Sequence, residues 1–320
     1  MKICVLALDG VFDTGLATVL DAFSTANELA EMSGITSLHF DITIVGVQSV
    51  VRTSQGLSVP VVPANECTVT DWVVVPAIGF KMPGPLQAAL ARPDMRNATE
   101  ALRRWADQGT GIAAACIGTF VLAESSLLDQ QEATTTWWLA PLFRKRYPKV
   151  RLDESRMIIN SAQFLTAGAA LSHLDMALWL IRRASPELAT MTAKYLIADT
   201  RSSQSVYAIP NHLAQSDPLV GLFEHWARDR LADGFSLEAA ARATATSKRT
   251  LARRTQQVLG KSPLSYFQDL RVERAIHLLE TSDLSVDQIA SKVGYADGVT
   301  LRALLRRRLG RGVRELRPRQ

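Results

Sequence analysis

One cysteine stands where the chain could present a nucleophile. Cys116 directly follows the apolar run 111–115 and precedes Gly118 and a predicted helix. A strand, a sharp turn and a helix in this order expose the middle residue at the end of a sheet, and the helix N-terminus lowers the pKa of a thiol placed there. Cys116 is therefore either a reactive thiol or a small buried residue that serves packing.

A reactive thiol needs a base within hydrogen-bond reach, and the histidines are the first candidates. The chain has five of them: His39, His173, His212, His225 and His277. Only His173 could approach Cys116, because it lies on the helix predicted for residues 169–183, just after Gly168. We expect His173 to be a helix-surface or satisfied core histidine rather than the base.

Positive charge is the second feature with a chemical meaning. Residues 221–320 carry 19 Lys and Arg against 11 Asp and Glu, whereas the first 220 residues carry 17 against 20. This basic segment, attached to a mildly acidic N-terminal part, has two possible roles. It either binds a polyanion or forms a solvated basic surface.

A repeated pattern organises these basic residues. One unit begins at Ser236 and a similar unit begins about fifty residues later, at Ser285. Each Ser suits a helix N-cap, and each unit has a small residue, Ala241 or Ala290, where two helices must approach closely. Two helices across a short turn, the second rich in arginine, are typical of the helix-turn-helix motif, here at about 236–259 and 285–309.

The second helix of each unit is the predicted recognition helix. Residues near its start read base edges in the major groove, and those farther along contact phosphate. The predicted base contacts are Lys248, Arg249, Thr250, Arg253, Asp297, Thr300 and Arg302, and the predicted phosphate contacts are Arg306 and Arg307.

A single helix is predicted between the two units, over residues 263–279. It would span about 25 Å, close to the ~34 Å that separates successive major-groove faces on one side of B-DNA. Arg271 lies inside its apolar face, so we expect a carboxylate partner for this side chain.

The elements before this region alternate between short apolar runs and amphipathic segments. Strands are predicted at 2–8, 40–45, 72–76 and 111–115, with helices at 16–31, 95–108 and 169–183. This alternation predicts an α/β domain with a flavodoxin-like parallel sheet covered by helices on both faces, followed by an all-α domain with two helix-turn-helix units. The predicted boundaries are 1–190 for the α/β domain, 191–217 for a linker region and 218–320 for the helical domain.

Several classes of protein are disfavoured. No stretch approaches the roughly 18 apolar residues of a membrane span, and the first apolar run is broken by Asp9. Three cysteines (Cys4, Cys67 and Cys116) without a CxxC pattern predict neither a disulfide framework nor a zinc site. We therefore expect a cytoplasmic protein with no membrane contact, no metal and no cofactor.

The C-terminal pattern resembles the AraC/XylS family of transcription regulators, which implies binding to double-stranded DNA. The resemblance covers about 218–317. It rests on Ser247, Arg249, Leu251, Arg253, Gly260, Ser262, Pro263, Tyr266, Arg271, Ala275, Leu278, Leu279, Ile289, Ala290, Gly294 and Tyr295. The sequence departs from the family pattern at Thr255, Leu301, Ala303 and Leu305.

The first ~185 residues resemble the PfpI-type branch of the class I glutamine amidotransferase-like superfamily. The matching pieces are 73–76 with Gly79, 114–118, 127–129 and 133–137. In enzymes of this superfamily a histidine stands where this chain has Thr136, and their acidic helper aligns near Gly15, with Asp13 close by. The resemblance therefore implies that Cys116 is a vestigial nucleophile position and that no residue is catalytic.

Together the two parts resemble GlxA-type transcription regulators. The leading hypothesis is a sequence-specific DNA-binding regulator, with the N-terminal domain as a sensor of a small-molecule effector, a homodimerisation module, or both. The expected ligand pocket is formed by Asp13, Gly79, Cys116, Ile117, Thr136 and Trp137. The alternative is a cysteine-dependent amidase or deglycase-like enzyme with an accessory DNA-binding domain. The duplicated helical unit favours the first hypothesis, and the missing histidine weighs against the second.

Overall fold

The chain forms two compact units, Met1–Tyr207 and Ala208–Gln320, in a computed structural model. The structure describes residues 1–35, 37–67, 70–198, 204, 217–309 and 313–316. The division between the units falls within the predicted linker region 191–217, most of which lies outside the described residues. Among the helices described, none is both long and apolar enough to cross a membrane.

A seven-stranded sheet forms the centre of the first unit. Its order is β10-β11-β7-β6-β1-β2-β5, and all neighbours pair in parallel except β10 with β11. The strands are β1 (Lys2–Leu6), β2 (Asp41–Gly46), β5 (Val62–Pro63), β6 (Trp72–Val75), β7 (Gly111–Ala115), β10 (Ile158–Ser161) and β11 (Phe164–Ala167). The central strands are apolar at nearly every position because both of their faces are buried.

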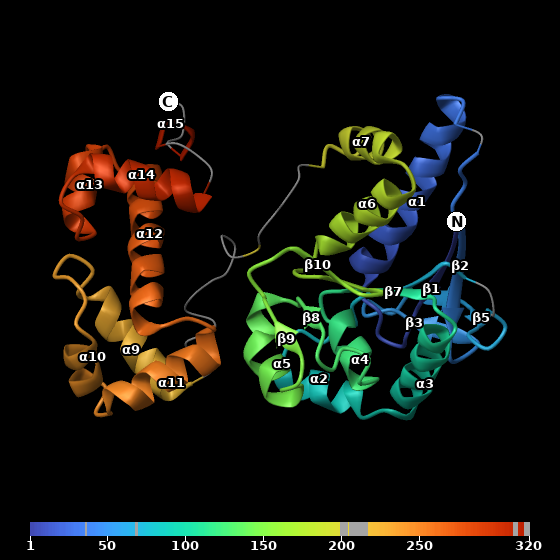
Figure 1. Ribbon diagram of the computed structural model, residues 1–320, viewed down its shortest axis with the longest axis horizontal. Helices are drawn as coiled ribbons and strands as arrows, with labels where there is room; N and C mark the ends of the chain where they lie inside the picture. Colours follow the sequence, from blue (N-terminus) through green and yellow to red (C-terminus); the bar gives the residue numbers. More distant parts are fainter. Residues whose placement is uncertain (36, 68–69, 199–203, 205–216, 310–312, 317–320) are drawn as a thin grey trace. The chain divides into compact units, whose positions relative to one another are not determined.

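Helices cover both faces of this sheet, each over its own apolar cluster (Figure 1). One face carries α1 (Asp13–Met32), α6 (Ser172–Ala184) and α7 (Pro186–Tyr195). The other face carries α2 (Pro83–Leu90), α3 (Pro93–Asp107), α4 (Gly118–Glu124) and α5 (Ala140–Arg146). The α/β architecture predicted from the alternation of strands and helices is confirmed.

Shorter elements lie at the edges of the sheet. β3 (Val50–Arg52) and β4 (Ser58–Pro60) form a hairpin, and β8 (Glu132–Ala133) pairs in parallel with β9 (Arg151–Leu152). A 3-10 helix, η1 (Trp137–Leu139), follows Thr136. The β10–β11 hairpin and α7 were not anticipated, and α7 carries the first unit past residue 190.

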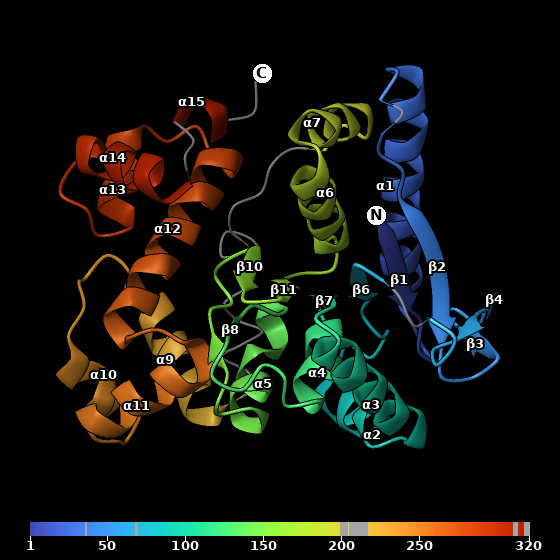
Figure 2. The same cartoon turned by 45° about the vertical axis from the view of Figure 1, so that its right-hand side comes forward.

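The described elements of the second unit are all helices (Figure 2). α9 (Pro218–Arg228), α10 (Leu237–Ala243) and α11 (Lys248–Leu259) lie at one end of the long helix α12 (Pro263–Thr281). α13 (Val286–Lys292), α14 (Gly298–Leu309) and α15 (Val313–Leu316) lie at its other end. The helix pairs α10–α11 and α13–α14 confirm the two predicted helix-turn-helix units.

Capping residues set the start of these helices. The side chains of Ser236 and Ser285 accept hydrogen bonds from the backbone N–H groups of Ala239 and Gln288, as their predicted N-cap role requires. Ala241 and Ala290, the small residues at the predicted helix contacts, are buried.

The structure corrects the expectation for the cysteines. Cys4 in β1 and Cys67, shortly before β6, form a disulfide, and Cys116 is a free, buried thiol. Spacing along the chain could not reveal this pair, because parallel pairing places β6 beside β1 although the two cysteines are 63 residues apart.

Candidate functional site

Cys116 occupies a sharp turn between β7 and α4. Its φ is 55°, in the left-handed region that residues other than glycine seldom adopt. Its backbone N–H donates to the Ala167 carbonyl at the end of β11, at 2.7 Å. At Gly118, a Cβ would collide with the carbonyl oxygens of Val75 and Pro76. The turn therefore depends on glycine at position 118 for its close approach to β6.

The thiol inside this turn is not activated. Burial raises the pKa of Cys116 to about 12, and the opposing hydrogen bonds from the Ile117 backbone and the Thr136 hydroxyl are smaller effects. The expectation that the N-terminus of the following helix would lower this pKa is wrong, because the side chain is only 3% exposed. Cys116 is therefore a protonated thiol near neutral pH, and the thiolate is the nucleophilic form.

His173 is fully engaged elsewhere. Its Nε2 accepts a hydrogen bond from the Ala77 N–H at 3.0 Å, and its Nδ1 lies 2.7 Å from the Ala170 carbonyl oxygen, to which it donates. Burial lowers the pKa of the ring to about 4, so it is neutral. A Cβ at Gly15 would lie 2.6 Å from Nε2, so the imidazole fills the space that a side chain at position 15 would need. His173 is a satisfied core histidine, as expected.

The buried imidazole makes the first unit sensitive to acid. The unfolded chain binds a proton near pH 6.5 and the folded chain only near pH 4, so stability is present above pH 6.5 and declines as the pH falls toward 4. We expect the free energy of unfolding to fall by about 3 kcal/mol more in the wild type than in His173→Gln between pH 7 and pH 4. Urea unfolding at a series of pH values measures this difference, and parallel pH profiles would contradict it.

The residues expected to form one ligand pocket lie in two groups. Cys116, Ile117, Thr136 and Trp137 are buried together around the turn after β7. Asp13 lies at the start of α1, where its Oδ2 accepts hydrogen bonds from the Ser54 hydroxyl and the Gln55 N–H, at 2.7 and 3.1 Å.

Desolvation acts to raise the pKa of Asp13, but hydrogen bonds from Ser54 and its neighbours lower it overall. Gly79, the sixth residue of the expected pocket, lines a cavity of about 250 Å³ together with Ser54, Arg52 and Arg92. Gly79 thus lines a cavity, next to the Ser54 that binds Asp13, whereas Cys116, Ile117, Thr136 and Trp137 are all buried.

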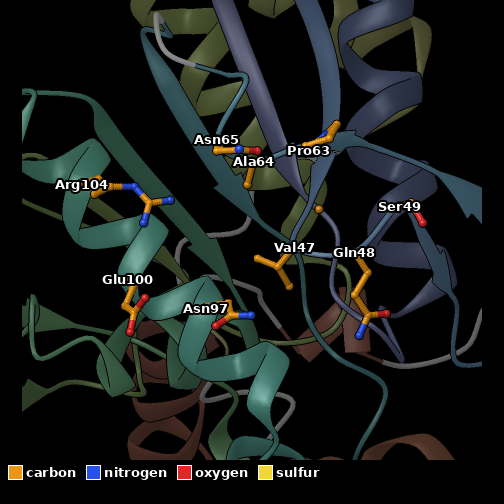
Figure 3. A pocket seen from close by; sticks show the side chains of 10 residues that line it. Val47, Gln48, Ser49, Pro63, Ala64, Asn65, Asn97, Glu100 and Arg104 are labelled. Carbon is orange, nitrogen blue, oxygen red and sulfur yellow. The ribbon is translucent and has the colours of Figure 1, made fainter.

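A second cavity, of about 380 Å³, was missed at the sequence level (Figure 3). Its walls come from the loop after β2, from the segment after β5 and from α3. α3 contributes Asn97, Glu100 and Arg104, whose spacing of three and four residues places them on one helical face. That polar stripe opposite the apolar face of α3 was the signal available in the sequence.

α11 presents a basic face opposite its buried face. Lys248, Arg249 and Arg253 are exposed, whereas Leu251 and Val258 are buried. Thr250 is half-buried, and its N–H donates to the N-cap Ser247 at 3.1 Å. Lys248 lies 3.8 Å from Glu238 of α10 in an exposed ion pair, which contributes little to stability.

α14 also presents exposed polar and basic side chains. Thr300, Arg302 and Arg306 are exposed, and the side chain of Arg307 lies outside the described residues. Asp297 accepts a hydrogen bond from the Thr300 N–H at 2.7 Å, which lowers the pKa of its carboxyl and caps the helix. Val299 is 69% exposed on the same helix, an apolar residue that the sequence reasoning passed over.

Arg271 has a different environment from the one expected. Its Nε donates to the Leu231 carbonyl at 2.9 Å, and its guanidinium lies over the rings of Phe267 and Tyr295, at 4.8 and 5.3 Å. Within the described part of the chain no carboxylate pairs with it, so that expectation is wrong. Aromatic faces and a carbonyl oxygen supply the negative potential that a carboxylate was expected to give.

Known proteins match the chain in both of its units. A family model described as the DJ-1/PfpI family matches residues 1–183, and one described as a helix-turn-helix domain matches residues 240–319. The HTH-type transcriptional regulator GbdR of Pseudomonas aeruginosa is 25% identical over 296 residues, which cover 91% of this chain and 77% of the relative. The HTH-type transcriptional regulator GlxA of Rhizobium meliloti is 26% identical over 202 residues, which cover 61% of each chain.

Solved structures show the same fold. An AraC family transcriptional regulator from Pseudomonas putida superposes with a TM-score of 0.51 at 18% identity, over 61% of this chain and 98% of that one. A transcriptional regulator protein from Vibrio parahaemolyticus gives the same TM-score at 21% identity, with the same coverage. The predicted resemblances to a PfpI-type domain and an AraC-type helix-turn-helix domain are confirmed. Because the first family model spans more than half of the sequence, the chain belongs to the DJ-1/PfpI family and carries a helix-turn-helix domain at residues 240–319.

Proposed function

We propose that the chain is a transcriptional regulator that recognises specific sequences in double-stranded DNA through both helix-turn-helix units. The observation that carries this proposal is the pair of exposed basic helix faces, on α11 and α14, joined by one rigid helix. The 19 residues of α12 span about 28 Å. This length is close to the ~34 Å between successive major-groove faces, so each recognition helix can enter its own groove.

The proposed contacts follow from exposure and position, and for Arg307 from its position along α14 alone. Lys248, Arg249, Thr250, Arg253, Asp297, Thr300 and Arg302 face base edges, and Arg306 and Arg307 face phosphates. Asp297 also orients α14 through its cap. Val299 adds an apolar side chain suited to contact with a thymine methyl group.

We infer that the first unit senses a small-molecule effector, or dimerises, without catalysing a reaction. A protonated Cys116 and a His173 with both ring nitrogens engaged support the absence of turnover. The effector site is proposed around Asp13, Gly79, Cys116, Ile117, Thr136 and Trp137. Pairing of two copies is proposed because most soluble oligomers are symmetric dimers and two-fold DNA sites mirror them.

Two arginines of α14 separate base reading from phosphate binding. We expect Arg302→Ala to weaken binding to the preferred site by about 1–3 kcal/mol and to relax preference at one base pair. Arg306→Ala should instead weaken binding to all duplexes alike and reduce the salt slope by about 0.9. Fluorescence anisotropy with preferred and scrambled duplexes over a salt series measures both effects. An equal loss on both duplexes for Arg302→Ala would rule out its base contact.

A further inference from the structure

Gln204 has a buried side chain, and this residue has no role in the function proposed above. It belongs to the segment that follows α7, and its side chain is 0% exposed. Its backbone N–H donates to the Ser155 carbonyl at 3.0 Å, which fixes the residue against the first unit. A buried side-chain amide is unusual unless polar groups accept its hydrogen bonds.

Three oxygen atoms receive the amide nitrogen of Gln204. Nε2 lies 2.8 Å from the Thr135 carbonyl, 3.2 Å from the Thr134 hydroxyl and 3.4 Å from the Arg156 carbonyl. The Thr134 hydroxyl is itself oriented, because it donates to the Arg156 carbonyl at 2.9 Å. These three acceptors form a built recognition site for an NH2 group, which we call the amide seat.

Gly168 makes the amide seat accessible to a side chain. A Cβ at Gly168 would overlap Nε2, Cδ and Oε1 of Gln204, so any other residue there would exclude the amide. Gly168 directly follows β11 and lies beside the turn at Cys116. The Cys116 N–H donates to the Ala167 carbonyl, and the Cys116 carbonyl accepts a hydrogen bond from the Thr135 hydroxyl at 2.7 Å. The amide seat therefore lies at the carboxyl end of the strands, where open α/β sheets bind ligands.

The amide seat provides hydrogen-bond partners for the nitrogen of the carboxamide but not for its oxygen. Oε1 of Gln204 is buried and has no hydrogen-bond partner among the described residues. An unpaired buried acceptor loses its bonds to water without replacement, so the seated state of Gln204 is weakened relative to a fully bonded amide. The same three acceptors can receive the NH2 group of a free carboxamide.

We propose that the amide seat is a binding site for small primary carboxamides, and that Gln204 is its tethered occupant. A free carboxamide that takes the seat displaces the Gln204 side chain, and we expect this displacement to change DNA affinity. This regulatory role rests on the proposed DNA-binding function, whereas binding at the seat does not.

The test uses the full chain with propionamide as the probe. Gln204→Ala empties the seat and should lower the thermal midpoint of the first unit by roughly 2–4 °C. Propionamide should bind Gln204→Ala at least tenfold more tightly than the wild type and restore the midpoint. Propionate and N,N-dimethylpropionamide, which lack the NH2 group, should do neither. Gln163→Ala removes a glutamine whose amide donates to the Ala106 carbonyl, away from the seat, and is the matched control.

Two further variants keep the result interpretable. Gln204→Glu keeps the size but replaces the donors, so it should leave the seat and allow propionamide to bind. Thr134→Val removes one acceptor and should weaken propionamide binding to Gln204→Ala. Equal binding of propionamide and its dimethyl derivative, or no binding to Gln204→Ala, would overturn the seat as a carboxamide site.

DNA affinity tests the regulatory half separately. Gln204→Ala should change DNA affinity at least threefold relative to Gln163→Ala, and propionamide should not reverse this change because the free amide is not covalently attached to residue 204. An unchanged affinity in Gln204→Ala would overturn the regulatory half. If the wild type itself fails to bind DNA, the proposed function is wrong while propionamide binding still supports the seat.

Discussion

Alanine at both Arg249 and Arg253 will weaken binding to the preferred DNA site by about 2–6 kcal/mol, because each base-reading arginine contributes about 1–3 kcal/mol of discrimination. Both side chains are exposed on α11, opposite the buried residues Leu251 and Val258, so their removal leaves the helix packing intact. The loss should be much smaller on a scrambled duplex, where only charge neutralisation is lost.

Competition binding with preferred and scrambled duplexes measures this effect, and circular dichroism checks that the variant is folded. Arg182→Ala, which removes an exposed positive charge from α6 of the first unit, is the control for net charge. If the double variant kept its affinity and its sequence preference, α11 would not be a recognition helix.

Arg271→Ala will destabilise the second unit by about 2 kcal/mol, through the loss of cation–π contacts and of a hydrogen bond to a backbone carbonyl. The guanidinium joins the loop that precedes the first helix-turn-helix unit to the turn of the second unit. It donates a hydrogen bond to the carbonyl of Leu231, between α9 and α10, and stacks over the ring of Tyr295, between α13 and α14. DNA affinity should fall as well, because the two recognition helices lose a contact that fixes their spacing.

Urea unfolding of the full chain, followed by the signal of the second unit, measures the change. Arg274→Ala lies on the exposed side of the same helix and should change stability by less than about 0.5 kcal/mol. Equal stability of the two variants would show that the stacked guanidinium does not hold the units together.

Periodicity and turn chemistry made much of the fold predictable. The alternation of apolar runs and amphipathic segments gave the parallel sheet, and the run 111–115 is β7 without any shift of its ends. Ser236 and Ser285 marked the two helix starts because a side-chain oxygen at the N-cap has a local effect that sequence alone reveals.

Features that depend on contacts between distant segments were not predictable. The Cys4–Cys67 disulfide joins residues that are 63 positions apart, and the contact of Arg271 with Tyr295 joins residues that are 24 positions apart. The high pKa of Cys116 depends on burial, which its neighbours along the chain do not indicate. Gln204 lies in a polar stretch of sequence that resembles an ordinary linker. Its seat is formed by residues remote in sequence, which are Thr134, Thr135, Arg156 and Gly168.

Selection of bound DNA from a random pool tests the central claim most directly, because it asks whether this chain reads sequence at all. The two-unit arrangement predicts an enriched site with two short motifs about one helical turn, ~10 base pairs, apart on one face of the duplex. Arg249→Ala should return the same spacing with relaxed preference within one motif. A pool that remains random after selection with the folded wild-type chain would contradict the account.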